Sequence, residues 1–260
     1  MEYLATIKNN CTRELLVARF KAFAIHFSLS LIIFLIISYF LIFHWFPAPF
    51  FFSEGGWQGM KIMIGVDLVL GPLLTLLIYN PLKRRKEIII DLSVIVIIQL
   101  SALAWGLSNV YSQRIMAISY WESSFYAVYP HALTEQGLGD QHFLQVSQET
   151  PPVVYTRQPF RGESDELVTW NSEKGLPIWS IGFLHRPFES GYAVINGLRL
   201  MPEEIYRQQP SAKAEVEKVA EQHNLSVDEV IIVPFRGKYQ TEWLLLSQRG
   251  KVLTSIAIND

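Results

Sequence analysis

Three long apolar runs dominate the first 111 residues. They cover about residues 23–46, 57–79 and 88–107. At about 1.5 Å of rise per residue, each run is long enough to cross a hydrocarbon layer of about 30 Å as a helix. Aromatic residues, which favour the headgroup layer, mark the predicted ends: Trp45, Trp57, Tyr79, Trp105 and Tyr111. We predict three transmembrane helices in a transmembrane domain of residues 22–111, after a short segment of residues 1–21.

After Tyr111 the pattern changes to short apolar runs between polar, proline-containing stretches. Runs rich in β-branched and aromatic residues predict strands over residues 115–120, 125–129, 153–156, 167–170, 178–183, 227–233, 242–247 and 251–258. The glycine late in the 248–250 connection is typical of a hairpin turn. Helices are predicted over 202–208 and 211–223, the second with Ser211 as N-cap. Residues 112–260 should therefore form an α+β domain.

Lys and Arg residues are concentrated in two of the segments that flank the predicted helices. They are Lys8, Arg13, Arg19 and Lys21 before the first run, and Lys83, Arg84, Arg85 and Lys86 between the second and third. The 47–56 connection contains neither residue type. Because basic flanks stay on the cytoplasmic side, the N-terminus is predicted to be cytoplasmic and residues 112–260 to lie outside. In a bacterium this means a multi-pass inner-membrane protein with a periplasmic domain.

Composition supports a mixed architecture, since 50% of the 260 residues are apolar and 18% are charged. The formal charge is +3 for residues 1–111 and −5 for residues 112–260. The apolar runs make the lipid bilayer an expected partner. Nucleic acid is not expected, because the domain of residues 112–260 is acidic.

The single Cys11 allows no intramolecular disulfide. The first run ends in Phe46-Pro47-Ala48-Pro49 rather than a small-x-small cleavage site, which predicts a retained anchor.

Asp67 lies near the middle of the second apolar run, where an acidic side chain costs about 2.5 to 3.5 kcal/mol on insertion scales. With Gly71 and Thr75 it forms a stripe of small and polar residues at helical spacing, and Pro72 predicts a kink. Such a stripe favours helix contact. Two interpretations are favoured: Asp67 pairs within the bundle, for example with Gln99 or a serine of the first helix, or the stripe binds a partner. Proton relay is a third choice, less favoured because no second acid lies deep in a predicted span.

The third run carries Gln99, Ala102 and Gly106 on one face, a small-xxx-small pattern that allows close helix packing. This face suits packing within the bundle as well as packing against another protein. His26 and His44 lie near opposite ends of the first run, too far apart to share a metal ion within that helix. We interpret both histidines as interfacial residues.

The sequence contains no recognisable catalytic motif. A glycine-rich phosphate loop, H-E-x-x-H and G-x-S-x-G are all absent. His131, His142, His185 and His223 are scattered among acidic residues, as on a solvated surface. We therefore expect no enzyme activity, no catalytic residues, no metal and no cofactor.

Several motifs together resemble those of one family. The chain reads HWFPAP at residues 44–49, GGW at 55–57 and GVDLVLGPLLTL at 65–76. Shorter matches follow through the third run, and VPFRGK at 233–238 and the stretch from Trp243 to Val252 continue them. These motifs resemble the TfpX/TfpZ family of type IV pilin accessory proteins. The resemblance marks Pro234, Arg236, Gly237 and Trp243 as periplasmic motif residues. Residues 120–225 match loosely, which makes them the expected source of pilin specificity.

The resemblance implies an inner-membrane protein that supports the stability, assembly or surface display of its cognate major pilin and has no established catalytic activity. Pilin is then the expected partner, with other pilus assembly proteins as further candidates. The competing interpretation is a membrane-embedded transferase that modifies pilin or an envelope glycan. On this interpretation the helical bundle shields the pilin helix, acting as a chaperone, and the periplasmic domain contacts the pilin head. The hypothetical contact surface in the membrane comprises Asp67, Gly71, Pro72, Thr75, Gln99, Ala102 and Gly106.

Overall fold

The computed structural model describes residues 2–258, without the side chains of residues 2–12 and 164. The inferences on the Lys8 and Cys11 side chains thus lie outside the described part. The chain divides into two compact units. The first combines Met1–Leu41 with Trp57–Tyr111, and the second combines Ile42–Gly56 with Ser112–Asp260. Each unit is described separately below.

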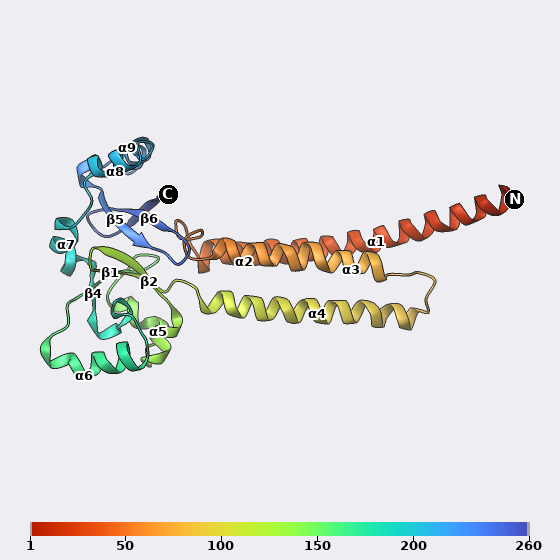
Figure 1. The fold of residues 1–260 in the computed structure, drawn as a ribbon, viewed down its shortest axis with the longest axis horizontal. Helices are drawn as coiled ribbons and strands as arrows, with labels where there is room; N and C mark the ends of the chain where they lie inside the picture. Colours follow the sequence, from red (N-terminus) through yellow and green to blue (C-terminus); the bar gives the residue numbers. More distant parts are fainter. Residues whose placement is uncertain (1, 259–260) are drawn as a thin grey trace. The chain divides into compact units, whose positions relative to one another are not determined.

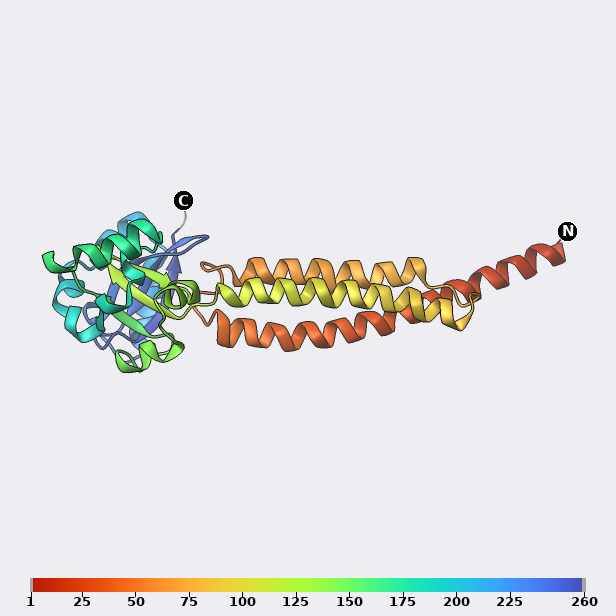
Figure 2. The ribbon, with the colours of Figure 1, turned by 90° about the horizontal axis from the view of Figure 1, so that it is seen from below.

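The first unit consists of helices that run alongside one another (Figure 1, Figure 2). Its elements in chain order are α1 (Glu2–Phe40), α2 (Gly56–Met63), the π-helix η2 (Ile64–Leu70), α3 (Gly71–Ile78) and α4 (Arg85–Ser112). A further π-helix, η1 (Leu41–Trp45), continues α1. Three helical stretches are long and apolar enough to cross a membrane: Arg13–Trp45, Gly56–Ile78 and Arg85–Ser112. They contain the three predicted runs almost entirely.

The second apolar stretch changes its helical geometry just before Pro72. Proline has no backbone N–H, so it cannot donate to the carbonyl four residues earlier. The N–H of Gly71 instead donates to the carbonyl of Val66, five residues back. Wider turns of this kind are a frequent cause of helix bending. The irregularity predicted at Pro72 thus takes the form of the π-helix η2.

The second unit is built on a seven-stranded mixed sheet with the order β4-β3-β1-β2-β5-β6-β7. The strands are β1 (Ala117–Trp121), β2 (Ser124–Val128), β3 (Val153–Thr156), β4 (His185–Pro187), β5 (Ile231–Arg236), β6 (Thr241–Leu246) and β7 (Val252–Ala257). The pairs β1–β3 and β2–β5 are parallel, and the remaining pairs are antiparallel. Gly250 has a φ of 80° in the β6–β7 connection, which agrees with the predicted hairpin turn.

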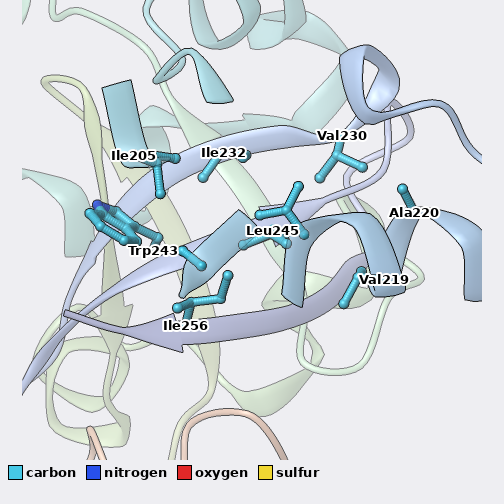
Figure 3. Packing of buried hydrophobic residues seen from close by; sticks show 10 residues of the cluster. Ile205, Val219, Ala220, Val230, Ile232, Trp243, Leu245 and Ile256 are labelled. Carbon is cyan, nitrogen blue, oxygen red and sulfur yellow. The ribbon is translucent and has the colours of Figure 1, made fainter. Parts of the chain in front are cut away.

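The second unit also contains helices. They are α5 (Pro130–Glu135), α6 (Ser164–Leu167), α7 (Phe188–Gly197), α8 (Pro202–Gln208) and α9 (Ala212–Gln222). Of these, α7 packs against β3 and α9 against β7. Short 3-10 turns lie at η3 (Asp140–Gln145), η4 (Arg161–Glu163), η6 (Ile178–Ser180), η7 (Gly182–Leu184) and η8 (Val227–Glu229), and η5 (Val168–Glu173) is a π-helix. Side chains of α8 and α9 form a buried apolar cluster with β5, β6 and β7 around Trp243 (Figure 3).

Most regular elements of this unit agree with the sequence predictions, and α8 and β3 agree residue for residue. Two predicted strands are wrong. Residues 167–170 belong to α6 and η5, and residues 178–183 form the turns η6 and η7. Both stretches are short apolar runs, whose periodicity does not separate strand from helix. Ser211 occupies the predicted N-cap position of α9, but its side chain makes no capping hydrogen bond.

Residues 42–56 belong to the second unit, although the sequence analysis placed 47–56 within the transmembrane domain. The ring of Phe50 packs against Phe235 at 4.9 Å, and both side chains are fully buried. The backbone N–H of Tyr239 donates to the carbonyl of Ser53 at 2.9 Å. A Cβ added to Gly237 would lie 2.8 Å from the Ser53 Cβ, so glycine permits this close approach. The connection is therefore a structural part of the sheet domain.

Candidate functional site

A chain of polar side chains joins the helices of the first unit. His26 of α1 bonds through Nδ1 to the Thr75 hydroxyl of α3 at 2.6 Å, and through Nε2 to Oε1 of Gln99 at 2.9 Å. Because an amide oxygen only accepts, Nε2 carries the proton in the Gln99 bond. Nδ1 then accepts from the Thr75 hydroxyl, whose single proton has the Gly71 carbonyl, at 3.3 Å, as its alternative acceptor. His26 thus bridges two other helices, a role that the sequence did not indicate, and its position near the membrane interface stays a prediction.

Gln99 of α4 is the hub of this network. Its Nε2 donates to Oδ1 of Asp67 at 3.2 Å, to the Asp67 carbonyl at 3.3 Å and to the Ser30 hydroxyl at 3.2 Å. Asp67 is 3% exposed, so the amide supplies a partner to an acid that would otherwise be buried alone. We name His26, Ser30, Asp67, Thr75 and Gln99 the helix network.

The predicted contact stripe lies largely inside the first unit. Asp67, Gly71, Pro72 and Thr75 are buried, and Gln99 is half-buried. Of the two interpretations of Asp67, pairing within the bundle is the one that the hydrogen bonds display. Binding of a partner by the stripe stays a prediction. The remaining two positions differ, since Ala102 is exposed and a Cβ on Gly106 would meet nothing within 4 Å.

Gly71→Ala is expected to loosen the helix network. The added Cβ would lie 2.3 Å from Gln99 Oε1, and moving the amide away sacrifices its bond to His26. We expect the free energy of unfolding to fall by about 1 to 3 kcal/mol, which is typical of an overpacked site. Gly65→Ala is the matched control, because its Cβ would meet nothing within 4 Å and alanine favours a helix. Thermal unfolding in detergent should show a lower melting temperature for Gly71→Ala alone; equal values would contradict the tight contact.

In the second unit, Glu54 anchors the 42–56 segment to the sheet domain. The Tyr129 hydroxyl donates to its Oε2 at 2.5 Å, and the Lys238 backbone N–H donates to its Oε1 at 3.2 Å. Burial raises the pKa of the Glu54 carboxyl from its ordinary value near 4.5 to about 7. Burial also raises the pKa of Tyr129, and the adjacent Glu54 carboxylate adds to this effect. A second buried acid, Glu242, likewise has a pKa raised by burial.

A pocket of about 390 Å³ opens in the same unit. The rings of Tyr126 and Trp179 stack on its wall, with centroids 4.1 Å apart. Arg236 and Lys238 supply positive charge, and His131 lies on the lining as well. Arg236 therefore stands out among the family-motif residues as an exposed side chain at a pocket.

The other three family-motif residues, Pro234, Gly237 and Trp243, contribute to the packing of the domain. Trp243 is 2% exposed in the apolar cluster of Figure 3, and it is paired with Pro234 across β5 and β6. Gly237 accommodates Ser53 of the 42–56 segment, as described above. These residues shape the domain, so their presence in a motif is accounted for by packing.

Two histidines of the second unit are neighbours, contrary to the expectation of dispersed surface histidines. Nε2 of His142 lies 3.1 Å from Nδ1 of His185, and His185 also bonds to the Trp179 carbonyl at 3.0 Å. Burial lowers the pKa of His185 to about 4 and also lowers that of His142. No group of three or more metal-ligating side chains occurs among the described residues. The two imidazole rings form one hydrogen-bonded pair, in which His185 is buried and His142 is half-buried.

Comparison with known proteins relates the chain to bacterial fimbriae. It is 40% identical over 100 residues to the fimbrial assembly protein of serogroups C1 and C2 of Dichelobacter nodosus, a match covering 38% of this chain and 76% of that protein. The chain belongs to this family of fimbrial assembly proteins. The proteins of serogroups I and E1 match at the same identity over 100 residues, but the match spans only 39% of their lengths. No family model and no solved structure matches.

This membership confirms the fimbrial part of the resemblance noted above, whereas the narrower TfpX/TfpZ assignment stays a prediction. Sequence reasoning missed several residues that the structure of this fimbrial assembly family member brings together, notably His26, Glu54 and Tyr129. One signal was available for Glu54: it is the only charged residue of the 47–56 connection. Tyr129 gave no such signal, because its partner lies 75 positions away in the chain.

Proposed function

We propose that this chain is a non-catalytic accessory protein of type IV pilus assembly, which resides in the bacterial inner membrane and binds its cognate major pilin. The observation that carries the proposal is the 40% identity to fimbrial assembly proteins. The three helical stretches able to cross a membrane support a membrane location. Binding to pilin would assist its stability, assembly or display.

The arrangement of the second unit supports the proposed topology independently of the positive charges. Residues 42–56 and 112–260 fold together, so they must lie on the same side of any membrane that the chain crosses. Two candidate spans, Gly56–Ile78 and Arg85–Ser112, separate these segments, and two crossings return a chain to the side it left. The distribution of Lys and Arg assigns that side to the periplasm.

The apolar exposed surface of α4 is the part of the first unit that we assign to pilin. Its outward residues on the Ala102 side include Val94, Ile98 and Trp105, each at least half exposed. Ala102 and Gly106 on this helix leave room for a second helix to approach closely. A pilin held in the membrane as a single helix would find a surface of the right kind there.

Site-directed photo-crosslinking in cells that produce the cognate major pilin tests the proposal. A crosslinker at Ala102 should capture pilin, whereas one at Ile97 should capture little, since five residues turn the side chain to another side of the helix. Deletion of the gene that encodes the present protein should reduce piliation, while the mass of mature pilin stays unchanged. Absence of any pilin crosslink, together with normal piliation, would refute the proposal. A changed pilin mass would favour the transferase.

A further inference from the structure

The pocket of the second unit lies where the parallel strands β2 and β5 separate. Their only bridging pair is Phe125 with Phe235, and the residues that follow, Tyr126 and Arg236, therefore point to the same face of the sheet. Both line the pocket. The segment between Gly175 and Ser180 contributes further residues to the lining. The sheet thus places an aromatic ring and a guanidinium group side by side at one opening.

One wall of the pocket is aromatic and apolar. Tyr126 and Trp179 stack with an interplanar angle of 17°, and both rings are only half-buried. Leu176 and Pro177 continue this wall. Stacked rings form a rigid surface that can receive an apolar side chain with little loss of conformational entropy.

The charge of the pocket is opposite to that of its domain. Its lining contains Arg236, Lys238 and His131 but no Asp or Glu, within a region of residues 112–260 that carries −5. Arg236 and Lys238 are exposed, and neither has an ion-pair partner among the described residues. The Lys238 ammonium donates a hydrogen bond to Gln113 Oε1, which holds it at the pocket edge. Lys238 also lies 5.7 Å from the centroid of the Tyr239 ring and interacts electrostatically with Glu54, so Arg236 is the more available of the two cations. A cationic opening favours an anion.

We propose that this pocket binds a carboxylate-bearing peptide segment, with the carboxylate paired to Arg236 and Lys238 and a neighbouring apolar side chain against the Tyr126–Trp179 wall. A neutral sugar would leave the positive charge of Arg236 unpaired. A bare phosphate would leave the aromatic wall unused. The inference concerns the second unit alone and holds whether or not α4 contacts pilin.

Fluorescence anisotropy on the full chain in nonionic detergent tests this binding. The probe is the fluorescein-labelled peptide Ala-Phe-Glu-Phe-Glu-Ala, compared with the same peptide carrying Gln for Glu. We expect the Glu peptide to bind at least about tenfold more tightly, because charge-assisted pairs exceed neutral hydrogen bonds in strength. Replacing Phe by Ser in the probe should also weaken binding. These arms use the unaltered protein, so they do not depend on the folding of a variant.

The protein variants locate the site. The double variant Arg236→Gln, Lys238→Gln should bind the Glu peptide about tenfold more weakly. The matched control Lys213→Gln, Lys218→Gln removes the same charge from the exposed side of α9 and should leave binding unchanged. Equal affinity for the Glu and Gln peptides, or an equal loss in both double variants, would overturn the proposal. So would Arg236-dependent binding of phosphatidylglycerol vesicles without peptide binding, which would assign the pocket to lipid headgroups.

Discussion

Glu54→Gln is expected to make the second unit more stable than the wild type above neutral pH and no more stable in acid. The Glu54 carboxyl has a pKa raised to about 7 in the fold, against an ordinary value of 4.5. Between these values the folded protein binds a proton that the unfolded chain releases, so wild-type stability falls as pH rises through this window. Glutamine removes this dependence while its oxygen still accepts one hydrogen bond from Tyr129 or Lys238.

The expected change in the free energy of unfolding is large. From pH 5 to pH 8, the stability difference between variant and wild type should move by about 2.5 kcal/mol in favour of the variant. The lowered pKa of His185 acts with the opposite sign, since stability then rises with pH between about 4 and 6.5. This contribution is common to both proteins and cancels in the comparison.

Chemical unfolding of the full chain in detergent, followed by tryptophan fluorescence at several pH values, measures the effect. Glu166→Gln is the matched control, because Glu166 is exposed and its replacement should leave the pH dependence of the wild type unchanged. Parallel pH curves for Glu54→Gln and the wild type would contradict the prediction. Such a result would mean that Glu54 is ionised in the folded protein at neutral pH.

Gln99→Leu is expected to destabilise the first unit by about 2 kcal/mol, taking four hydrogen bonds at about 0.6 kcal/mol each in a membrane. Leucine fills a similar volume but leaves the buried Asp67 and one nitrogen of His26 without their amide partner. The loss of helical circular dichroism on heating in detergent should shift to lower temperature.

Ser101→Leu on the same helix supplies the control for Gln99→Leu. It also replaces a polar residue by leucine, but Ser101 is exposed, so its melting temperature should stay near that of the wild type. If both variants melt alike, the helix network contributes nothing to stability. Asp67 would then tolerate burial for a reason other than its contact with Gln99.

Some features of this fold are accessible from sequence because one local property determines them. The long apolar runs predict the three helical stretches, since length and hydropathy alone decide whether a helix can cross a membrane. Strand β3 and helix α8 carry clear local patterns and were predicted with their observed bounds. The Asp67–Gln99 pair was named as one alternative because helical spacing puts both residues near mid-membrane depth.

Other features depend on contacts between distant residues and leave no local trace. His26 lies in an apolar run, and only the packing of three helices brings it to Thr75 and Gln99, 49 and 73 positions away. Residues 42–56 were interpreted as a simple connection between two helices, because no local sequence pattern indicates that they contact Phe235 and Gly237. The helix α7 was missed because its sequence mixes glycine and β-branched residues, which are weak helix formers.

The contribution of residues 42–56 to the sheet domain has a consequence for biosynthesis. Glu54 leaves the ribosome 184 residues before Lys238, to which it bonds, so the domain cannot close until nearly the whole chain has been made. Until then Phe46 and Phe50, both buried in the finished fold, have no sheet to cover them. Contacts of such long sequence separation form slowly. Until the domain closes, proteases and chaperones on the same side of the membrane can therefore reach residues 42–56.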